Sequence, residues 1–458
     1  MQANRADSGE GLRVGGAASV ATHPIHVSPH AHSRPPLRLS SASRELLLTV
    51  GRGLTLAALV CLLPGGCGEE GGYPAAPGRL DVRDVRVLLF DAQEGCRIRV
   101  DGPYKLRSSS GQELSAGGRM SWTEVHAGSG VRLGGMAPVE GALTVEAARY
   151  GTIRVAARRD GEFLPGAQYA GSLVLSVRPD GGVRAVNVVD VESYVAGVVP
   201  NEAWPGFHYE SLKGQAIAAR SYVLYIMSRR ADRPFDLRAG EGDQVYRGMR
   251  LDSFARRTRR AVDDTRGVVL CWPTPVGDRA FCTYYSAACG GMSQSLADVQ
   301  PGASVPDPLR GAVRCDYCRI AKGNAYRWGP AEIAKKDLLE RMRTRRRECA
   351  AWKVIDSVIV SRMTMAGRVA EVTVIGDSEQ RVVMVGEHFR LAVGSRVMRS
   401  TDCVVVDSGD RVRFTSGRGF GHGLGLCQWG MEGQARAGKA AGEILRYYYP
   451  GSKLVRAY

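Results

Sequence analysis

The 458-residue sequence has no apolar run long enough to span a bilayer, and it contains few lysines. The apolar run Leu54–Leu63 falls short of the roughly 18 residues that a membrane-spanning helix needs. Only 8 of the 62 basic residues are lysines, so arginine supplies most of the positive charge. The formal net charge is +16. No nucleic-acid-binding motif accompanies this charge. A basic surface suits an anionic polymer, and a glycan that bears carboxylates is favoured over nucleic acid. The alternative is a compositional bias toward arginine that marks no binding face.

Long repeats and coiled-coil heptads are also missing, which excludes solenoid and fibrous architectures. No thiol has a recognisable His–carboxylate partner, so cysteine nucleophile chemistry is not expected. At 44% apolar residues, the chain is long enough for two or three packed domains.

The N-terminal part has the composition of an exported protein. Residues 1–43 are rich in His, Ser, Pro, Gly and Arg without an apolar period, and we expect a disordered extension. Residues 44–67 resemble a signal segment, because basic residues precede the short apolar run and small residues precede Cys67. Residues 68–79 are predicted to be a Gly/Pro-rich linker. We expect export to the cell envelope or periplasm with lipid attachment at Cys67, which would be the only contact with a membrane.

The rest of the chain is predicted to be α+β. Over 80–186, short runs rich in β-branched residues alternate with Gly, Asp and Pro turns, which indicates a β-rich N-terminal region. A stripe of apolar residues at three- and four-residue spacing predicts a helix over 209–229, in which Gly214 indicates a close neighbour. A second helix is predicted over 330–345, beginning at Pro330. Further strands are predicted over 354–361, 369–375, 381–386 and 411–415, and further helices over 432–437 and 441–449. Residues 187–458 therefore form a mixed α/β region.

Glu202 is the best candidate for a reactive side chain. We expect it on a proline-bounded loop before the 209–229 helix, close to Val198, Val199 and Trp204. Apolar surroundings disfavour the charged form of a carboxyl, so its pKa is expected to rise. A glutamate of this kind donates protons near neutral pH, as in sugar-cleaving sites. The alternative is a glutamate that caps the helix or pairs with an arginine.

Three further stretches supply polar groups or exposed backbone N–H groups. The first two are 243–248 and 286–291, which are suited to holding sugar hydroxyls or acetamido groups but could also be ordinary turns. The third, 417–425, is a glycine-rich loop that lacks the Lys-Ser/Thr ending of a phosphate-binding loop. We expect it to present His422 and Gln428 to the same cleft as Glu202. A structural histidine is the competing interpretation.

The eleven cysteines include one pair with metal-ligand spacing, Cys315 and Cys318, and Cys289 is the nearest thiol carried by a motif. Tetrahedral zinc needs a fourth ligand, for which Cys282, His422 and Cys427 are candidates. In an exported protein a disulfide is the rival interpretation. Structural zinc and a disulfide both remain open at this point.

Together these stretches resemble the stage II sporulation protein D / LytB amidase-enhancer family. The resemblance rests on Val199-Pro-Asn-Glu202, on Thr283-Tyr-Tyr-Ser-Ala-Ala-Cys-Gly-Gly291 and on Gly417-Arg-Gly-Phe-Gly-His-Gly-Leu-Gly-Leu-Cys-Gln-Trp-Gly430, in family order. The chain departs from the family pattern at Ala203, Gly214, Cys427 and Trp429. None of these departures removes Glu202.

The resemblance implies a lytic transglycosylase that acts on peptidoglycan, with Glu202 as its catalytic acid and a glycan-binding cleft in 187–458. The implied substrate is the MurNAc–GlcNAc backbone, preferably of strands without stem peptides, and the product is 1,6-anhydroMurNAc. The chemistry requires no cofactor. Some members bind zinc beside the active site, which the cluster of Cys289, Cys315 and Cys318 resembles. The predicted substrate contacts are Arg220, Ser221, Gln244, Tyr246, Ser286, Gly290, Gly291, His422 and Gln428.

The family also implies an alternative from a different functional class. The chain could be a glycan-binding module without activity of its own that enhances a separate cell-wall amidase, which would then be a partner. A purely structural surface lipoprotein is a third interpretation. Replacement of Glu202 by Gln distinguishes them, because only the enzyme loses product formation while it keeps glycan binding.

Overall fold

The computed structural model describes residues 73–75, 84–92, 94–240 and 242–458. The predicted extension 1–43, the signal segment 44–67 with Cys67, and most of the linker 68–79 lie outside the described residues. The described part mixes helices and sheets, so the predicted α+β class is confirmed. None of its helices is long and apolar enough to cross a membrane.

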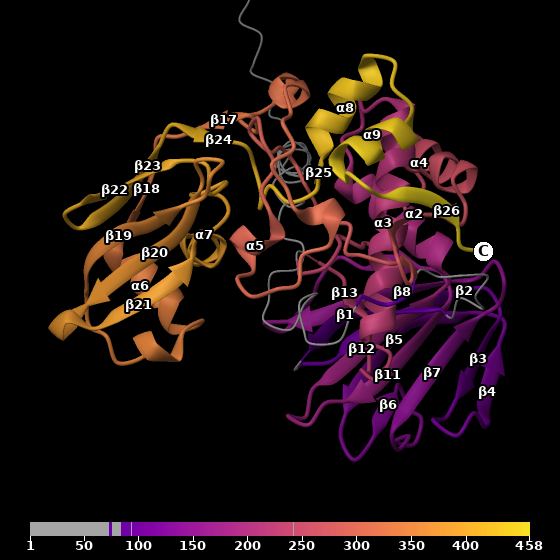
Figure 1. Cartoon of the computed structure of the whole chain (residues 1–458). Helices are drawn as coiled ribbons and strands as arrows, with labels where there is room; N and C mark the ends of the chain where they lie inside the picture. The colour runs from indigo at the N-terminus through magenta and orange to yellow at the C-terminus, as the bar shows by residue number, and fades with distance from the viewer. Residues whose placement is uncertain (1–72, 76–83, 93, 241) are drawn as a thin grey trace, which may run out of the picture. The chain divides into compact units, whose positions relative to one another are not determined.

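Two antiparallel sheets form the N-terminal region (Figure 1). The seven-stranded sheet has the order β13-β1-β12-β11-β7-β3-β4, with only β13 parallel to its neighbour. Its strands are β1 (Val85–Ala92), β3 (Tyr104–Arg107), β4 (Glu113–Gly117), β7 (Ala142–Ala147), β11 (Ser172–Val177), β12 (Val183–Val189) and β13 (Leu237–Arg238). The second sheet contains β2 (Cys96–Asp101), β5 (Met120–Ala127), β6 (Val131–Leu133), β8 (Thr152–Arg159), β9 (Glu162–Phe163) and β10 (Ala167–Tyr169). Alternate residues of each sheet, such as Ile98 and Leu173, are fully buried in one core, as the two-residue period of a strand requires.

Helices from two distant parts of the chain complete this first core. They are α2 (Val191–Glu202), α3 (Tyr209–Arg229), α4 (Ser253–Asp264), α8 (Gln428–Arg436) and α9 (Ala441–Tyr448). The predicted 209–229 helix is confirmed with the same bounds, and Figure 1 shows α8 and α9 beside it. The close neighbour of Gly214 is Met431 of α8, whose sulfur would lie 2.8 Å from a Cβ at that position.

The structure corrects the predicted position of Glu202. It is the last residue of α2 and not part of a loop. Asp190 caps the start of α2 by accepting the Ser193 N–H at 3.0 Å, and Pro200 lies inside the last turn. Proline interrupts the hydrogen-bond ladder of a helix, but Val198 and Val199 are fully buried and hold this turn against the core. Tertiary packing therefore extends the helix past the proline.

A second hydrophobic core lies between residues 328 and 414. It contains β18 (Ala331–Ala334), α6 (Lys335–Arg343), β19 (Ile355–Met363), β20 (Val369–Gly376), β21 (Arg381–Val385), α7 (Gly386–Val393), β22 (Val404–Ser408) and β23 (Arg411–Thr415). The three predicted strands over 354–386 are confirmed as β19, β20 and β21, and 411–415 is β23. The predicted helix over 330–345 is wrong at its start, because Ala331–Ala334 pair with β23 and the helix begins at Lys335.

Shorter elements connect the two cores. They are β14 (Val268–Thr274), β15 (Gly277–Arg279), β16 (Tyr285–Ser286), α5 (Leu296–Val299), β17 (Arg327–Trp328), β24 (Gly417–Arg418), β25 (Leu426–Cys427) and β26 (Lys453–Arg456), with 3-10 turns at Asp307–Leu309, Tyr317–Ile320, Arg347–Cys349 and Asp377–Glu379. Strand β16 pairs with β25 and strand β17 with β24. The β16–β25 pairing brings the second and third sequence motifs together.

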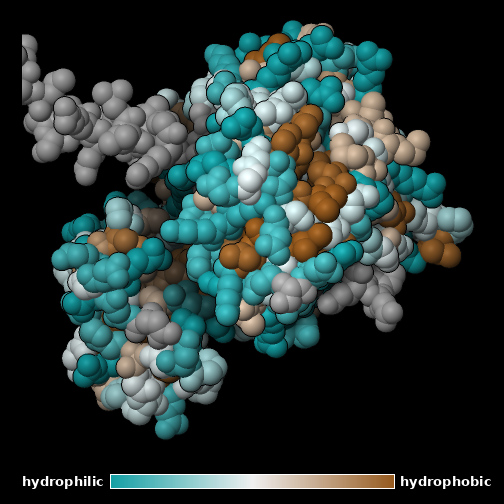
Figure 2. All heavy atoms as spheres, turned by 90° about the vertical axis from the view of Figure 1, so that its left-hand side faces the viewer, coloured by the Kyte–Doolittle hydropathy of each residue, from teal (hydrophilic) through white to brown (hydrophobic). Residues whose placement is uncertain are grey.

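The sheets of the second core expose apolar side chains to solvent. Ile359 of β19 and Val383 of β21 are both about half exposed, as are Val404 and Val406 of β22. Figure 2 views the molecule from the side on which this core lies in Figure 1, and it shows hydrophobic residues gathered in a patch among hydrophilic ones.

A buried ion pair joins α2 to α3. Arg220 donates to the two oxygens of the Glu192 carboxylate at 2.9 and 2.7 Å, and both side chains are at least 98% buried. Arg220 also donates to the Val262 and Val268 carbonyls. All three guanidinium nitrogens therefore have acceptors inside the protein.

We expect Glu192→Gln to lower the free energy of unfolding by about 3–5 kcal/mol, because the substitution leaves the Arg220 charge uncompensated in the interior. Chemical denaturation measures this change. The matched control is Glu340→Gln, which breaks the exposed pair with Arg343 and should change stability little. Equal effects of the two substitutions would contradict the assignment.

Candidate functional site

The carboxyl group of Glu202 is buried at the end of α2, with 5% of the residue exposed. Its Oε1 accepts a hydrogen bond from the Val245 N–H at 2.8 Å. Its Oε2 is buried and has no hydrogen-bond partner within the described part of the chain. The hydrogen-bonding capacity of this second oxygen is therefore unused within the described structure.

Burial raises the pKa of Glu202 from 4.5 to about 7. The Val245 N–H, the positive charge of Arg247 and the nearby Tyr285 side chain all act in the opposite direction. Loss of hydration therefore outweighs three stabilising influences on the carboxylate. A substantial fraction of Glu202 is protonated at neutral pH, as general acid catalysis requires.

A chain of hydrogen bonds orients the tyrosine beside Glu202. The Tyr194 hydroxyl donates to Gln244 Oε1 at 3.1 Å, and Gln244 Nε2 donates to the Tyr285 hydroxyl at 3.0 Å. Burial raises the pKa of Tyr285 well above its usual value, so the hydroxyl keeps its proton. The predicted contact residue Gln244 thus lies in the second layer and supports Tyr285.

The glycine-rich loop and the residues after it reach the same place. Gln428 Nε2 donates to the Glu202 carbonyl at 3.0 Å and to Gln215 Oε1 at 3.2 Å. Gln428 therefore fixes the end of α2 from the protein side.

His422 is fully buried, and its Nδ1 accepts the Leu424 N–H at 3.0 Å. The pKa of His422 is lowered to about 3, mainly by burial and also by the charges of Arg390 and Arg368, while a backbone hydrogen bond at Tyr285 opposes them. The imidazole is neutral at physiological pH. It adjoins Tyr285, the residue that also adjoins Glu202.

Three predicted substrate contacts have structural roles instead. Arg220 is occupied by the buried pair with Glu192, and the Ser221 hydroxyl donates to the Ile217 carbonyl and accepts the Leu270 N–H. Tyr246 is buried and donates its hydroxyl to Asn187 at 2.8 Å. These three predictions are corrected because helix α3 and its neighbours enclose the side chains.

The second motif meets the glycine-rich loop directly. Ser286 lies on β16 with a buried hydroxyl that has no partner among the described residues. Gly290 has a φ of +76°, and a Cβ there would lie 2.8 Å from the Arg418 carbonyl carbon. Gly291, with a φ of +125°, has open space at the same position.

Four cysteines converge behind this contact. Their Sγ atoms all lie within 4.8 Å of one another, and all four residues are buried: Cys289, Cys315, Cys318 and Cys427. The Sγ atoms of Cys289 and Cys318 are 3.8 Å apart, which matches the spacing of about 3.8 Å that tetrahedral zinc with 2.3 Å bonds imposes on its thiolates. None of the described cysteines forms a disulfide. The four thiols thus fit a closed structural zinc site, in which Cys427 is the fourth ligand and neither Cys282 nor His422 takes part.

Two residues of the site were missed by the sequence reasoning. Tyr285 lies beside Glu202, and Arg247 is an exposed cation close enough to lower the pKa of Glu202. Both belong to motifs that sequence reasoning had singled out, at 283–291 and 243–248. The available signal was therefore their position next to Ser286 and Tyr246, but nothing in the spacing shows which side chain points inward.

The fold is α+β, and the site contains the buried carboxyl of Glu202, whose pKa is raised to about 7. Residues 179–272, which include Glu202, match the family model described as SpoIID, Stage II sporulation protein. An uncharacterized protein of Brachyspira hyodysenteriae is 28% identical over 381 residues, which cover 81% of this chain and 92% of that protein. These similarities support the resemblance to the stage II sporulation protein D / LytB amidase-enhancer family that the motifs predicted.

Two named relatives come from Bacillus subtilis. The protein named Amidase enhancer is 28% identical over 304 residues, which cover 56% of this chain and 40% of that protein. The protein named Stage II sporulation protein D is 25% identical over 294 residues, which cover 60% of this chain and 77% of that protein. The chain thus matches less than half of the amidase enhancer's length.

We expect the purified protein to hold about one zinc ion per chain, since four buried thiolates at this spacing form a closed tetrahedral site. Elemental analysis by mass spectrometry measures the zinc content. Cys315→Ser should lose most of the metal and lower the thermal unfolding midpoint. Cys282→Ser, which changes a buried thiol outside the cluster, should keep both. A disulfide between any two of the four cysteines would overturn this expectation.

Proposed function

We propose that the protein is an exported peptidoglycan lytic transglycosylase that cleaves the MurNAc–GlcNAc glycan backbone. The observation that carries the proposal is the buried Glu202 carboxyl with a pKa of about 7 and one unbonded oxygen. The match to the SpoIID family model and the name of the amidase-enhancer relative support a cell-wall-related role. Activity on peptidoglycan and location in the envelope are part of the proposal.

In the first step, Glu202 donates its proton to the glycosidic oxygen as the C1–O bond breaks. The leaving sugar departs with a new hydroxyl, and Glu202 becomes a carboxylate. The neutral Tyr285 hydroxyl beside it stabilises that carboxylate in the dry site. The Val245 N–H, already bonded to Oε1, does the same without reorganisation.

In the second step, the Glu202 carboxylate takes the proton from the muramyl 6-hydroxyl as that oxygen bonds to C1. The product carries a 1,6-anhydro ring, and Glu202 regains its proton. Intramolecular attack needs no second carboxylate as nucleophile or base, unlike ordinary glycoside hydrolysis. The nearest carboxylate in the motif, that of Asp243, is bound by Arg230 and by the Arg238 N–H, which is consistent with one acting carboxyl.

Two exposed or polar groups are suited to positioning the substrate. Arg247 presents a positive charge near Glu202 and would attract a glycan that carries carboxylates. Ser286 has a buried hydroxyl without a partner in the described structure, which can bond a sugar hydroxyl. The preferred strand on this proposal has lost its stem peptides.

The second candidate is an enhancer of a cell-wall amidase, favoured by the name of the Bacillus subtilis relative. An enhancer needs the fold and the surface but not the proton of Glu202. Amidase stimulation that survives Glu202→Gln, together with no anhydro-sugar from the unaltered protein, would favour this candidate.

We expect Glu202→Gln to reduce the release of 1,6-anhydromuramyl ends by about 10²- to 10⁴-fold, because glutamine cannot donate a proton. Digestion of peptide-free glycan followed by mass spectrometry of the ends measures the rate. Binding of the glycan should persist, since the amide has nearly the shape of the carboxyl. Glu162→Gln, an exposed change of the same kind on β9, is the matched control and should keep full activity.

We expect kcat/KM to fall as the pH rises through about 7, since the free enzyme must carry the proton on Glu202. Below that pH the acid is protonated and this dependence disappears. A pH–rate profile on soluble glycan checks the sign and the midpoint. A rate that stays constant up to pH 9 would contradict the assignment of Glu202 as the acid.

A further inference from the structure

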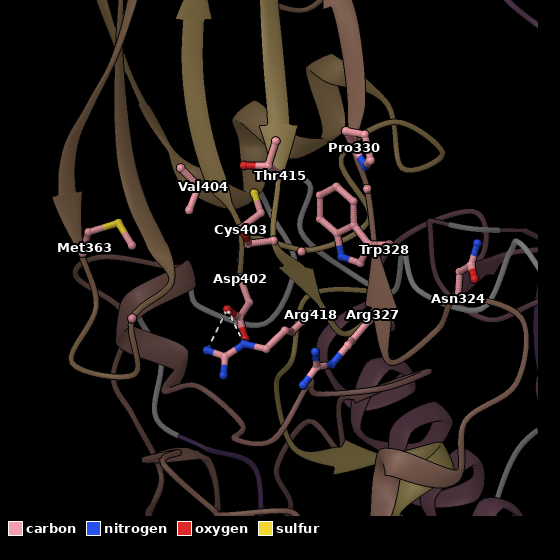
Figure 3. A pocket seen from close by; sticks show the side chains of 14 residues that line it. Asn324, Arg327, Trp328, Pro330, Met363, Asp402, Cys403, Val404, Thr415 and Arg418 are labelled. Atoms are coloured by element: carbon pink, nitrogen blue, oxygen red, sulfur yellow. Dashed lines mark hydrogen bonds and ion pairs between the residues drawn. The ribbon is translucent and has the colours of Figure 1, made fainter.

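A cavity of about 790 Å³ lies away from Glu202, where the β17–β24 ladder meets the second core. None of the predicted catalytic or substrate-binding residues lines it. Its walls include Arg327, Trp328, Met363, Asp402, Val404 and Arg418 (Figure 3). The mechanism described above makes no use of these side chains.

Two arginines stand directly opposite each other in this ladder. Arg327 of β17 pairs with Arg418 of β24, and the next pair is Trp328 with Gly417. A Cβ at Gly417 would collide with the Trp328 ring, so the ring packs closely on the glycine. Adjacent residues of a strand face opposite sides, which leaves the two guanidinium groups together on the other face. Like charges directly opposite each other are destabilising, so this arrangement has a cost without an anion between them.

The carboxylate in the cavity compensates only one of the two arginines. Arg418 donates through Nε and Nη2 to Oδ1 of Asp402, at 3.2 and 3.1 Å. The Arg327 guanidinium is exposed and has no ion pair or side-chain hydrogen bond with any described residue. Two cations therefore face one carboxylate, and the cavity retains an excess of positive charge.

Apolar side chains line the cavity as well. Met363 is 48% exposed and Val404 is 51% exposed, and both border the cavity that contains the arginines (Figure 3). Such a lining suits a small ligand with a carboxylate at one end and an alkyl group next to it. Arginine is the residue that binds carboxylates through two parallel hydrogen bonds.

We propose that this cavity binds a 2-substituted propionate, a carboxylate whose neighbouring carbon bears a methyl group and a heteroatom. This proposal rests on the proposed function, and two groups derived from peptidoglycan contain such a propionate. One is the lactyl group of a muramyl residue that has lost its stem peptide, and the other is the terminal alanine of a free stem peptide. In an intact strand the lactyl carboxyl is an amide and carries no charge. The cavity therefore distinguishes peptide-free from peptide-bearing glycan.

The glycine-rich loop connects this cavity to the Glu202 site. Arg418 lines the cavity, and His422, four residues later, adjoins Tyr285. Between them, Phe420 exchanges backbone hydrogen bonds with Ala288 of the second motif. One short stretch of backbone therefore joins the arginine-lined cavity to the residues around Glu202.

The test measures binding in the full chain with Glu202→Gln, so that no probe is consumed. Ligand-observed NMR gives dissociation constants for three probes: GlcNAc–MurNAc with a free lactyl carboxylate, the same disaccharide with that carboxyl amidated, and N-acetyl-D-alanine. Arg327→Gln is the main variant, because its side chain is exposed and unpaired and the fold should tolerate the change. Arg413→Gln, an exposed arginine on β23 outside the cavity, is the matched control.

We expect about tenfold tighter binding of the free carboxylate than of its amide, as one charge-assisted pair of hydrogen bonds provides. Arg327→Gln should remove this difference, and Arg413→Gln should keep it. Whichever of the disaccharide and N-acetyl-D-alanine binds more tightly identifies the source. Equal affinity for acid and amide, or equal loss in the two arginine variants, would overturn the proposal. Neither result depends on whether Glu202 supports turnover, which the release of anhydro ends tests separately.

Discussion

Burial of a single carboxyl group is the constraint on which the rest of the site depends. Glu202 ends a helix whose last turn is pressed into the core by Val198 and Val199. An N–H group, a nearby arginine and a tyrosine all favour the carboxylate, and the pKa still reaches about 7. Desolvation is therefore the dominant effect, and any change that admits water to this position would return the pKa toward 4.5. Gln428 contributes to this burial, because its side chain donates a hydrogen bond to the Glu202 carbonyl and so holds the end of α2 in place.

The four-cysteine cluster helps to hold Gln428, and therefore the end of α2, in position. Cys427 directly precedes Gln428, and its Sγ accepts the N–H groups of Cys289 and Gly430. Gly430 has no room for a Cβ, because Cys315 and the Tyr448 hydroxyl occupy that space. A metal held by the four thiols would lock β25 and the start of α8 to the second motif. Such a metal would not take part in the reaction. It would fix the position of Gln428, which in turn fixes the position of Glu202.

The sequence predicted those helices and strands whose formation depends on short-range patterns of apolar residues. Helix α3 was predicted with its correct bounds, because its apolar stripe is long and glycine sits where Met431 approaches. The end of α2 was mistaken for a loop because Pro200 normally ends a helix, and only tertiary burial shows that it does not here. The family resemblance predicted Arg220 as a substrate contact, but its side chain lies inside the protein in the pair with Glu192. Helix α3 is enclosed on several sides, so even its polar side chains are buried. Two features could not be predicted: which cysteine completes the four-thiol cluster, and which side chain of a motif points inward. Both depend on strand pairings such as β16 with β25, and the spacing of residues in the sequence does not reveal these pairings.

On the proposals made above, the glycine-rich loop links a catalytic site in one core to a recognition site beside the other. Gly419 has a φ of +81°, and a Cβ there would lie 2.7 Å from the Ala288 carbonyl oxygen. The backbone can therefore run close to the second motif on its way from Arg418 to His422. A long polymer can touch two separate sites at once, so an enzyme that acts on one gains selectivity from contacts remote from the bond that breaks. The predominance of arginine over lysine in this chain agrees with recognition of carboxylates at a site remote from the bond that breaks. A bidentate arginine recognises the planar shape of a carboxylate as well as its charge.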